Sequence, residues 1–144
     1  MQTIIQTPAP QDLPVLAEMY YCIRKNEFHW ETVIDVDDFY RDTKGEAILE
    51  AVVDGRIAGF ISVWTETNFA HCLYIVAPYR RRGIGNKLIR EAVRQFGAPL
   101  TLKCMKENTN ALLFYEKNGW ALEETIETDD GACCVLRLDR EEKL

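Results

Sequence analysis

Three consecutive arginines, Arg80, Arg81 and Arg82, precede two closely spaced glycines in the segment Y79-R-R-R-G-I-G-N-K-L88. A guanidinium group pairs with phosphate oxygens in a forked geometry. A glycine has no side chain to keep a phosphate away from the backbone amides. This combination of residue types predicts an anion site, and a diphosphate would suit it. The alternative is a surface turn whose arginines face water.

The position of this segment in the chain supports an anion site. A nearly continuous apolar run over residues 70–76 predicts a strand in the centre of a sheet. Apolar residues over 84–96 recur at helical spacing, and Gly97 ends the pattern. The segment therefore joins the end of a strand to the start of a helix, where the first amides lack partners and the helix dipole is positive.

Two familiar phosphate-binding loops do not fit the segment. A P-loop requires Gly, four residues and then Gly-Lys-Ser/Thr, and this string is absent from the sequence. The dinucleotide fingerprint requires a third small residue, where this chain has Leu88. The sequence therefore favours a different class of anionic ligand.

The remaining patterns predict one domain over residues 1–144, of the α/β class with a mixed sheet. Further strands are expected over 3–6, 47–53, 56–65, 100–105, 120–127 and 132–138, with tight turns at 54–55 and 129–131. Helices are expected over 12–26, 36–41 and 108–117, with Asp12 and Asn108 as N-caps. The apolar face of the first helix comprises Leu13, Leu16, Ala17, Tyr20 and Tyr21.

Composition restricts the possible partners. The net charge of −6 disfavours nucleic acid and anionic membranes, because the overall field repels phosphate polymers. The N-terminal segment does not resemble a signal peptide, and no apolar run is long enough to span a bilayer. Five cysteines without C-x-x-C spacing indicate reduced thiols and no metal site. We therefore expect a cytoplasmic protein.

Two motifs in the sequence carry a resemblance to a known family. The string R80-R-R-G-I-G85 and the string N108-T-N-A-L-L-F-Y-E-K-N-G-W120 lie one helix and one strand apart. In type, order and spacing they resemble the signatures of the GNAT superfamily of acetyl-CoA-dependent N-acetyltransferases. The resemblance is dense over 54–120, and it departs at Ala77, where the family usually has proline. It implies a mixed, mostly antiparallel sheet of six to seven strands with about four helices.

The resemblance also implies a way of binding acetyl-CoA. The pyrophosphate would lie on the amides of residues 80–86, and the pantetheine arm would pair with exposed backbone of Leu73 and Ile75 as an added strand does. The cofactor-binding residues implied in this way are Leu73, Ile75, Arg80, Arg81, Arg82, Gly83, Gly85, Asn86, Asn108, Ala111 and Phe114.

Catalysis in this family is direct transfer of the acetyl group to a deprotonated amine. Tyr115 matches the tyrosine that gives a proton to the leaving thiolate, although a core aromatic beside Phe114 is the alternative. His71 is the candidate general base, with Glu66 or a water chain as alternatives. His29 and Glu31 belong to the segment where the family builds its acceptor pocket.

The segment from Glu27 to Asp42 is acidic and aromatic. Phe28, Trp30 and Glu31 are the predicted acceptor-binding residues, because carboxylates beside aromatic rings suit a cationic amine. A solvated helix face with core aromatics is the alternative. The acceptor is expected to be a small-molecule or peptide amine, and pairing through the last strands would give a homodimer. A non-catalytic acyl-CoA sensor and a nucleic-acid module that uses the arginines remain the competing functions.

Overall fold

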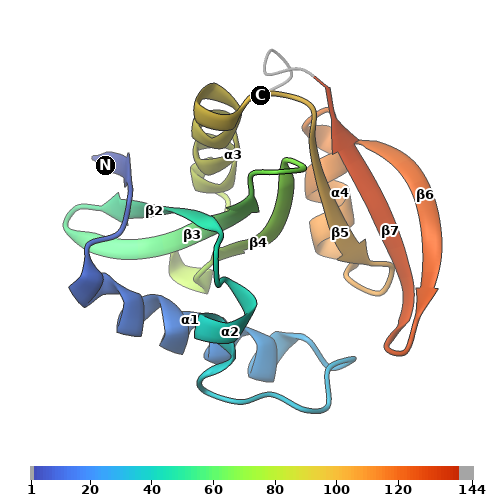
Figure 1. Cartoon of the computed structure of the whole chain (residues 1–144), viewed down its shortest axis with the longest axis horizontal. Helices are drawn as coiled ribbons and strands as arrows, with labels where there is room; N and C mark the ends of the chain where they lie inside the picture. Colours follow the sequence, from blue (N-terminus) through green and yellow to red (C-terminus); the bar gives the residue numbers. More distant parts are fainter. Residues whose placement is uncertain (1, 140–144) are drawn as a thin grey trace.

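A single seven-stranded sheet forms the centre of the protein in a computed structural model, which describes residues 2–139 (Figure 1). The strand order is β1-β2-β3-β4-β5-β7-β6, and only the β4–β5 pair is parallel. The strands are β1 (Thr3–Gln6), β2 (Ala47–Val53), β3 (Arg56–Trp64), β4 (Phe69–Ile75), β5 (Leu100–Met105), β6 (Ala121–Thr128) and β7 (Gly131–Leu138).

Four helices cover the two faces of this sheet. Figure 1 shows α1 (Leu13–Glu27) and α2 (Asp38–Asp42) on one face, and α3 (Ile84–Phe96) and α4 (Thr109–Lys117) on the other. Two short 3-10 turns, η1 (Pro10–Asp12) and η2 (Ala77–Tyr79), precede α1 and follow β4. The mixed, mostly antiparallel sheet with four helices confirms the predicted fold class. No helix within residues 2–139 has the length and apolar character that a membrane span requires.

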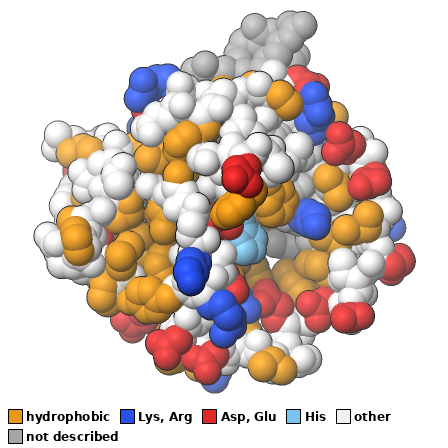
Figure 2. Space-filling view, in the orientation of Figure 1, with side chains coloured by type: hydrophobic (Ala, Val, Ile, Leu, Met, Phe, Trp, Pro, Cys, Tyr) orange, Lys and Arg blue, Asp and Glu red, His pale blue; other side chains and the backbone are white. Residues whose placement is uncertain are grey.

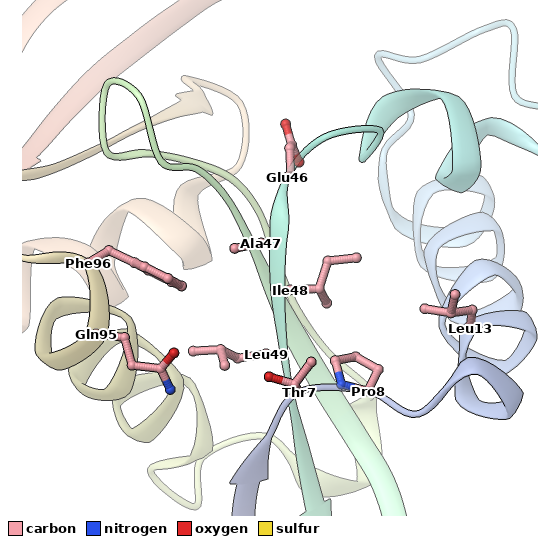
Figure 3. Close-up of a pocket in the computed structure, with 9 residues that line it drawn as sticks. All are labelled: Thr7, Pro8, Leu13, Glu46, Ala47, Ile48, Leu49, Gln95 and Phe96. Carbon is pink, nitrogen blue, oxygen red and sulfur yellow. The ribbon is translucent and has the colours of Figure 1, made fainter.

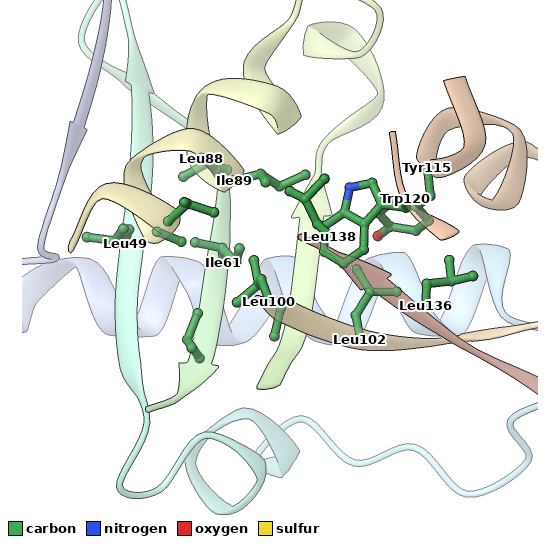
Figure 4. Packing of buried hydrophobic residues seen from close by; sticks show 14 of the residues in the cluster. Leu49, Ile61, Leu88, Ile89, Leu100, Leu102, Tyr115, Trp120, Leu136 and Leu138 are labelled. Carbon is green, nitrogen blue, oxygen red and sulfur yellow. The ribbon is translucent and has the colours of Figure 1, made fainter. Parts of the chain in front are cut away.

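Two hydrophobic clusters hold the layers together. The larger cluster lies between the sheet and α3 with α4, and its best-buried members include Leu88, Ile89, Ile61, Leu100 and Leu138 (Figure 4). The smaller cluster packs α1 and α2 on the opposite face. Burying one such leucine or isoleucine contributes about 1.5–3 kcal/mol relative to exposure. The helical periodicity over 84–96 therefore marks the face of α3 that is buried.

The parallel junction between β4 and β5 is very short. Its pairing is limited to Phe69 with Thr101 and Ala70 with Leu102. Beyond these two pairs the strands diverge, so the sheet divides into a β1–β4 part and a β5–β7–β6 part, as Figure 1 shows. The prediction that residues 70–76 form a central strand is confirmed, since β4 is fourth of seven. Its last three residues are nevertheless only half-buried, because no strand pairs with them on that side.

Differences from the predicted elements are confined to their ends. Asp12 belongs to η1 and makes no side-chain bond to the first turn of α1, because its carboxylate accepts the Ala9 amide at 3.1 Å. The helix α2 begins at Asp38, two residues after the predicted start. Tyr21 was predicted to lie on the apolar face of α1 and is only half-buried, because that face is centred on Leu16 and Tyr20.

Candidate active site

The divergence of β4 and β5 opens a cavity of about 400 Å³. Figure 2 shows the face of the molecule that is hollowed near its centre, with hydrophobic and charged side chains around the opening. The cavity is lined by Phe28, Trp30, Glu31, Phe69, Ala70, His71, Leu73, Tyr74, Leu102, Lys103, Cys104, Met105, Asn108, Ala111, Tyr115, Asp130 and Cys133. Most of the predicted catalytic and acceptor-binding residues therefore meet in one place.

Tyr115 reaches this cavity from the inner side of α4. It is 8% exposed, and its ring packs against Phe114 and Trp120 at centroid distances of 5.3 and 5.4 Å. Burial, reinforced by the nearby Cys104 and Cys72 thiols, raises the pKa of the phenol well above its ordinary value. Tyr115 is therefore a neutral donor at physiological pH.

The thiols that line the cavity are not activated. Burial raises the pKa of Cys104 to about 12, and burial also raises the pKa of Cys133. A thiolate is the nucleophilic form of cysteine, so neither side chain is prepared to form a covalent acyl-enzyme.

His71 lies at a bulge in β4. On β3, Ser62 is paired with Cys72 and the next residue, Val63, is paired with Ala70, so His71 is an extra residue in the ladder. A bulge re-aims a side chain. The His71 Nδ1 atom lies 2.9 Å from Glu46 Oε2, and Ser62 Oγ donates to Glu46 Oε1. Glu46 thus holds the His71 ring at Nδ1, while the ring lines the cavity.

The backbone of β4 is open toward the cavity. The Val76 amide donates to Ala58 O on β3 at 2.9 Å, so in this antiparallel ladder Val76 and Tyr74 direct their polar groups to β3. Leu73 and Ile75 consequently direct theirs to the opposite side, where pairing with β5 has already ended. Apart from the Ile75 carbonyl, which accepts from Arg80 Nε, this strand edge is available to a peptide-like ligand arm.

The residues of the predicted anion site lie at the N-terminus of α3. The first bond of this helix runs from the Lys87 amide to Gly83 O at 3.1 Å. The amides of Ile84, Gly85 and Asn86 precede that bond and have no carbonyl of the helix as acceptor. Gly83 has φ 78°, a conformation that favours glycine.

Gly85 has a second reason to be glycine. A Cβ atom at this position would lie 3.2 Å from Phe114 Cζ on α4, so the missing side chain allows α3 and α4 to approach closely. The anion site and the tyrosine helix are thereby fixed to each other. Asn86 adds a further link, because its Nδ2 donates to Asn118 Oδ1 at 2.8 Å, while its own Oδ1 is buried without a partner.

The three arginines differ in their surroundings. Arg80 binds both carboxylate oxygens of Glu27 at 2.7 and 2.9 Å, and its Nε donates to Ile75 O at 2.7 Å. Its amide donates to Ala77 O at 3.2 Å, so it is less available to an anion than the amides that follow. Arg81 is exposed with φ 63°, and the Arg82 guanidinium lies 5.7 Å from the Tyr79 ring centroid.

Asn108 caps α4, as the sequence predicts. Its Oδ1 accepts the Ala111 amide at 3.4 Å, and both residues line the cavity. A side chain at this position serves the helix and faces the ligand space at the same time.

The acceptor side is built mainly from aromatic rings. Phe28 stacks on Trp30 at 4.8 Å and meets Tyr74 edge-on at 5.6 Å. The Glu31 carboxylate accepts from Arg24 Nε at 2.8 Å and Nη2 at 2.5 Å. The Glu31 carboxylate is therefore already engaged in an ion pair, with a guanidinium that also binds the buried Asp38 at 3.0 Å.

Two other candidates lie away from the cavity wall. Glu66 is exposed in the turn between β3 and β4, and His29 Nε2 lies 2.6 Å from Glu107 Oε2. Neither belongs to the residues that line the cavity. His71 is therefore the better-placed candidate base.

Sequence reasoning missed two charged residues of the site. Glu46 contacts His71 across 25 positions of the chain, and only the pairing of β2, β3 and β4 brings them together. Lys103 lines the cavity from β5, with its Nζ 5.8 Å from the Phe69 ring centroid. No carboxylate among residues 2–139 forms an ion pair with it. Alternation of side chains along β5 alone could have predicted that Lys103 projects from the other face of the strand than the buried Leu102 and Cys104.

A second pocket of about 340 Å³ lies between α1 and α3 at the edge of β2 (Figure 3). It is lined by Thr7, Pro8, Leu13, Glu46, Ala47, Ile48, Leu49, Gln95 and Phe96. It contains none of the predicted site residues, so the chemistry is assigned to the cavity between β4 and β5.

A divided sheet, a strand edge open to an extended ligand and an anion site at the neighbouring helix are together the arrangement expected of an acyl-CoA-dependent transferase. The chain matches the Acetyltransferase (GNAT) family over residues 13–120, most of its length. It belongs to this family, whose enzymes are acetyl-CoA-dependent N-acetyltransferases. The predicted family and cofactor are thereby confirmed. None of the curated protein sequences matches the chain significantly.

Solved structures share the fold at low sequence identity. The ribosomal-protein-alanine N-acetyltransferase of Brucella melitensis superposes with a TM-score of 0.71 at 19% identity, covering 95% of this chain and 99% of its own. Naa50 of Arabidopsis thaliana, in complex with the bisubstrate analogue CoA-Ac-MVNAL, gives 0.71 at 20% identity over 97% of this chain and all of its own. The yncA protein of Salmonella typhimurium, with acetyl-CoA, gives 0.71 at 15% identity over 95% and 93%.

Proposed function

We propose that this protein moves the acetyl group of acetyl-CoA directly to a primary amine of a small molecule or peptide. The observation that supports this most strongly is that His71 and Tyr115, from β4 and α4, line the same cavity at the parallel junction of the sheet. One residue type suits proton removal and the other suits proton donation.

The residues around the junction fit acetyl-CoA. The amides of Ile84, Gly85 and Asn86 would receive the pyrophosphate, with Arg81 and Arg82 adding positive charge. The open edge at Leu73 and Ile75 would pair with the amide groups of the pantetheine arm. When bound, acetyl-CoA supplies a thioester, which is an acetyl group activated for attack by an amine.

Two side chains of the cavity, His71 and Tyr115, each carry out one proton transfer. His71 accepts a proton from the acceptor amine, which leaves the nitrogen with the lone pair that forms the new N–C bond. The Leu73 amide donates a hydrogen bond to the carbonyl oxygen as negative charge develops there. Tyr115 gives its proton to the departing sulfur, since burial keeps the phenol neutral until that charge appears. The second proton that the nitrogen loses as it becomes an amide restores the phenol.

The acceptor end favours an amine with an apolar or aromatic neighbour. Phe28, Trp30 and Tyr74 supply the contact surface, and Glu31 is neutralised by Arg24. The analogue bound to the Arabidopsis structure contains the peptide MVNAL, so a peptide N-terminus is one candidate for this chain. The exposed edge strand β6 is the surface that we assign to a homodimer.

The test is an acceptor screen in which release of free CoA is followed over a panel of small amines and peptides. Turnover that depends on both the amine and His71 supports the proposal. Tight acetyl-CoA binding without turnover of any amine would instead identify an acyl-CoA sensor. Salt-dependent DNA or RNA binding without CoA affinity would identify a nucleic-acid module.

A further inference from the structure

The contact behind His71 assigns a role to a residue outside the cavity. The Glu46 side chain is 8% exposed, whereas that of His71 is 37% exposed, and their Oε2 and Nδ1 atoms are 2.9 Å apart. We propose that Glu46, supported by Ser62, is the positioning residue that fixes His71 in the ring orientation and tautomer of a general base. This inference rests on the proposed acetyl transfer and adds a residue to it.

The fold brings the three residues together through strand register. Ile48 on β2 is paired with Ser62 on β3, and Ser62 is paired with Cys72 on β4. Side chains of paired residues share a face, and Glu46 lies two positions before Ile48, so it projects to the same face. Figure 3 shows Glu46 at the start of β2, beyond Ala47 and Ile48.

The bulge in β4 is the feature that completes the contact. In regular alternation His71 would face away from its neighbour Cys72. As the extra residue opposite Ser62, it instead shares the face of Cys72, which packs with α1 and α2. His71 therefore reaches Glu46 and the cavity at the same time.

The hydrogen bonds determine the tautomer. A carboxylate only accepts hydrogen bonds, and Ser62 Oγ donates to Oε1 of Glu46. The bond at Oε2 must then come from a proton on His71 Nδ1, so Nε2 of the neutral ring has a free lone pair. During transfer this Nε2 takes one proton from the amine and later releases it to water, while the Nδ1 proton stays with Glu46 as acceptor.

Other ionisable groups face the same cavity and contribute to any pH profile. They are two carboxyls, one ammonium, two phenols and two thiols, from Glu31, Asp130, Lys103, Tyr74, Tyr115, Cys104 and Cys133. The test therefore needs a readout that is specific for the His71 ring.

Nitrogen NMR of the imidazole provides that readout. The chain has two histidines, so His71→Asn assigns the His71 resonances against those of His29. In the unmodified protein we expect the Nδ1–H tautomer for neutral His71. In Glu46→Leu, which removes both hydrogen bonds, we expect the Nε2–H form that prevails for imidazole in water. An Nε2–H ring in the unmodified protein, or no change in Glu46→Leu, overturns the proposal.

Kinetics provide the second arm. Glu46→Leu is expected to lower kcat about 10-fold with little change in the KM for acetyl-CoA, and to cause no further loss in a His71→Asn background. A structural role would instead lower activity equally in both backgrounds. Glu46→Gln, which keeps one acceptor oxygen, is expected to recover part of the rate. The control is Glu18→Leu, at an exposed glutamate on α1 away from the cavity lining.

The two arms separate the possible failures. No turnover of any amine, with the Nδ1–H tautomer present, overturns the proposed acetyl transfer and the catalytic role with it. Two results would overturn the role of Glu46 but leave the proposed acetyl transfer intact. One is turnover with neutral His71 in the Nε2–H form, and the other is turnover in which Glu46→Leu lowers kcat further in the His71→Asn background.

Discussion

The proposed site has two ends that are built in different ways. The proposed cofactor end consists of residues 80–86, which lie outside the cavity lining, with the backbone of Leu73 and Ile75, and the proposed acceptor end consists of the cavity residues Phe28, Trp30, Glu31, His71 and Lys103. The cofactor end uses mainly backbone amides from one continuous segment. The acceptor end uses side chains from the α1–α2 loop, β4 and β5, which are distant in sequence.

This difference explains which ligand the sequence can identify. Backbone amides at a helix N-terminus favour an anion, and they come from one short segment, so a short motif can indicate such a site. At the acceptor end, a charge is informative only after its partners are known. Glu31 is neutralised by Arg24, whereas Lys103 has no carboxylate partner among the described residues.

The proposed difference between the two ends is wrong if position 85 at the cofactor end tolerates a charged side chain. Gly85→Glu places a carboxylate beside the amides of α3 and a Cβ atom 3.2 Å from Phe114, so we expect acetyl-CoA affinity to fall at least about 100-fold. Titration calorimetry measures this. Gly85→Ala is the matched control, because it adds the same Cβ atom against Phe114 without adding charge; binding as weak as that of Gly85→Glu would show that packing, and not the charge, is responsible.

Tyr115 lies between the two ends and tests the division of roles. Tyr115→Phe removes the proton donor and keeps the buried ring, so we expect kcat to fall about 100-fold while acetyl-CoA affinity is retained. Steady-state kinetics and calorimetry measure the two quantities. An unchanged kcat would return Tyr115 to a purely structural role.

A buried carboxyl outside both ends, that of Glu50, makes the stability of the protein depend on pH. Glu50 is fully buried on β2, and burial raises its pKa from 4.5 to about 7. The folded state therefore binds this proton more tightly than the unfolded chain, so stability is full below pH 4.5 and declines as pH rises through 7. Glu50→Gln should remove that decline and increase the free energy of unfolding by about 2 kcal/mol at pH 8.

Denaturant unfolding at pH 5 and pH 8 checks the Glu50 prediction. The variant should differ from the parent protein mainly at pH 8. An equal difference at both values would mean that Glu50 does not titrate in this range.

Charge compensation at the acceptor end predicts unequal effects of two substitutions. Lys103→Met is expected to raise the KM of a carboxylate-bearing amine about 3- to 10-fold relative to its uncharged analogue, because no carboxylate of residues 2–139 forms an ion pair with Lys103. Glu31→Gln should change this preference less, since Arg24 already holds the charge. The measurement is kcat/KM for matched pairs of acceptors, and equal sensitivity to both variants would contradict the comparison.

The smallest effect on ligand binding is expected at the ion pair between Arg80 and Glu27. Arg80 is held by Glu27 at the end of α1, and both side chains are more than a third exposed. Glu27→Gln should release the guanidinium and tighten acetyl-CoA binding about 2- to 5-fold at low salt, with little change in stability. Weaker binding in calorimetry would show that Glu27 instead holds Arg80 in its binding position.

Much of the fold could be predicted because its signals are local. The helix over 84–96, the strand over 100–105 and the Asn108 cap agree with the structure in their bounds. Asp12 occupies the predicted N-cap position of α1 but makes no side-chain cap bond, because the preceding 3-10 turn uses its carboxylate. The pairs of Arg80 with Glu27 and of His71 with Glu46 could not be predicted, because each joins segments that only the tertiary fold brings together. Arg24 and Glu31 are seven positions apart, but their contact depends on how the chain turns after α1.

The two-pair junction of β4 and β5 has a consequence for how the chain assembles. The β2–β3–β4 meander and the β6–β7 hairpin form from neighbouring segments, whereas the junction must first close the long loop that contains α3. Loop-closure entropy makes such non-local pairing slow. We therefore expect amides in β2 and β3 to gain protection early in refolding, and the ligand cavity to appear only in the final step.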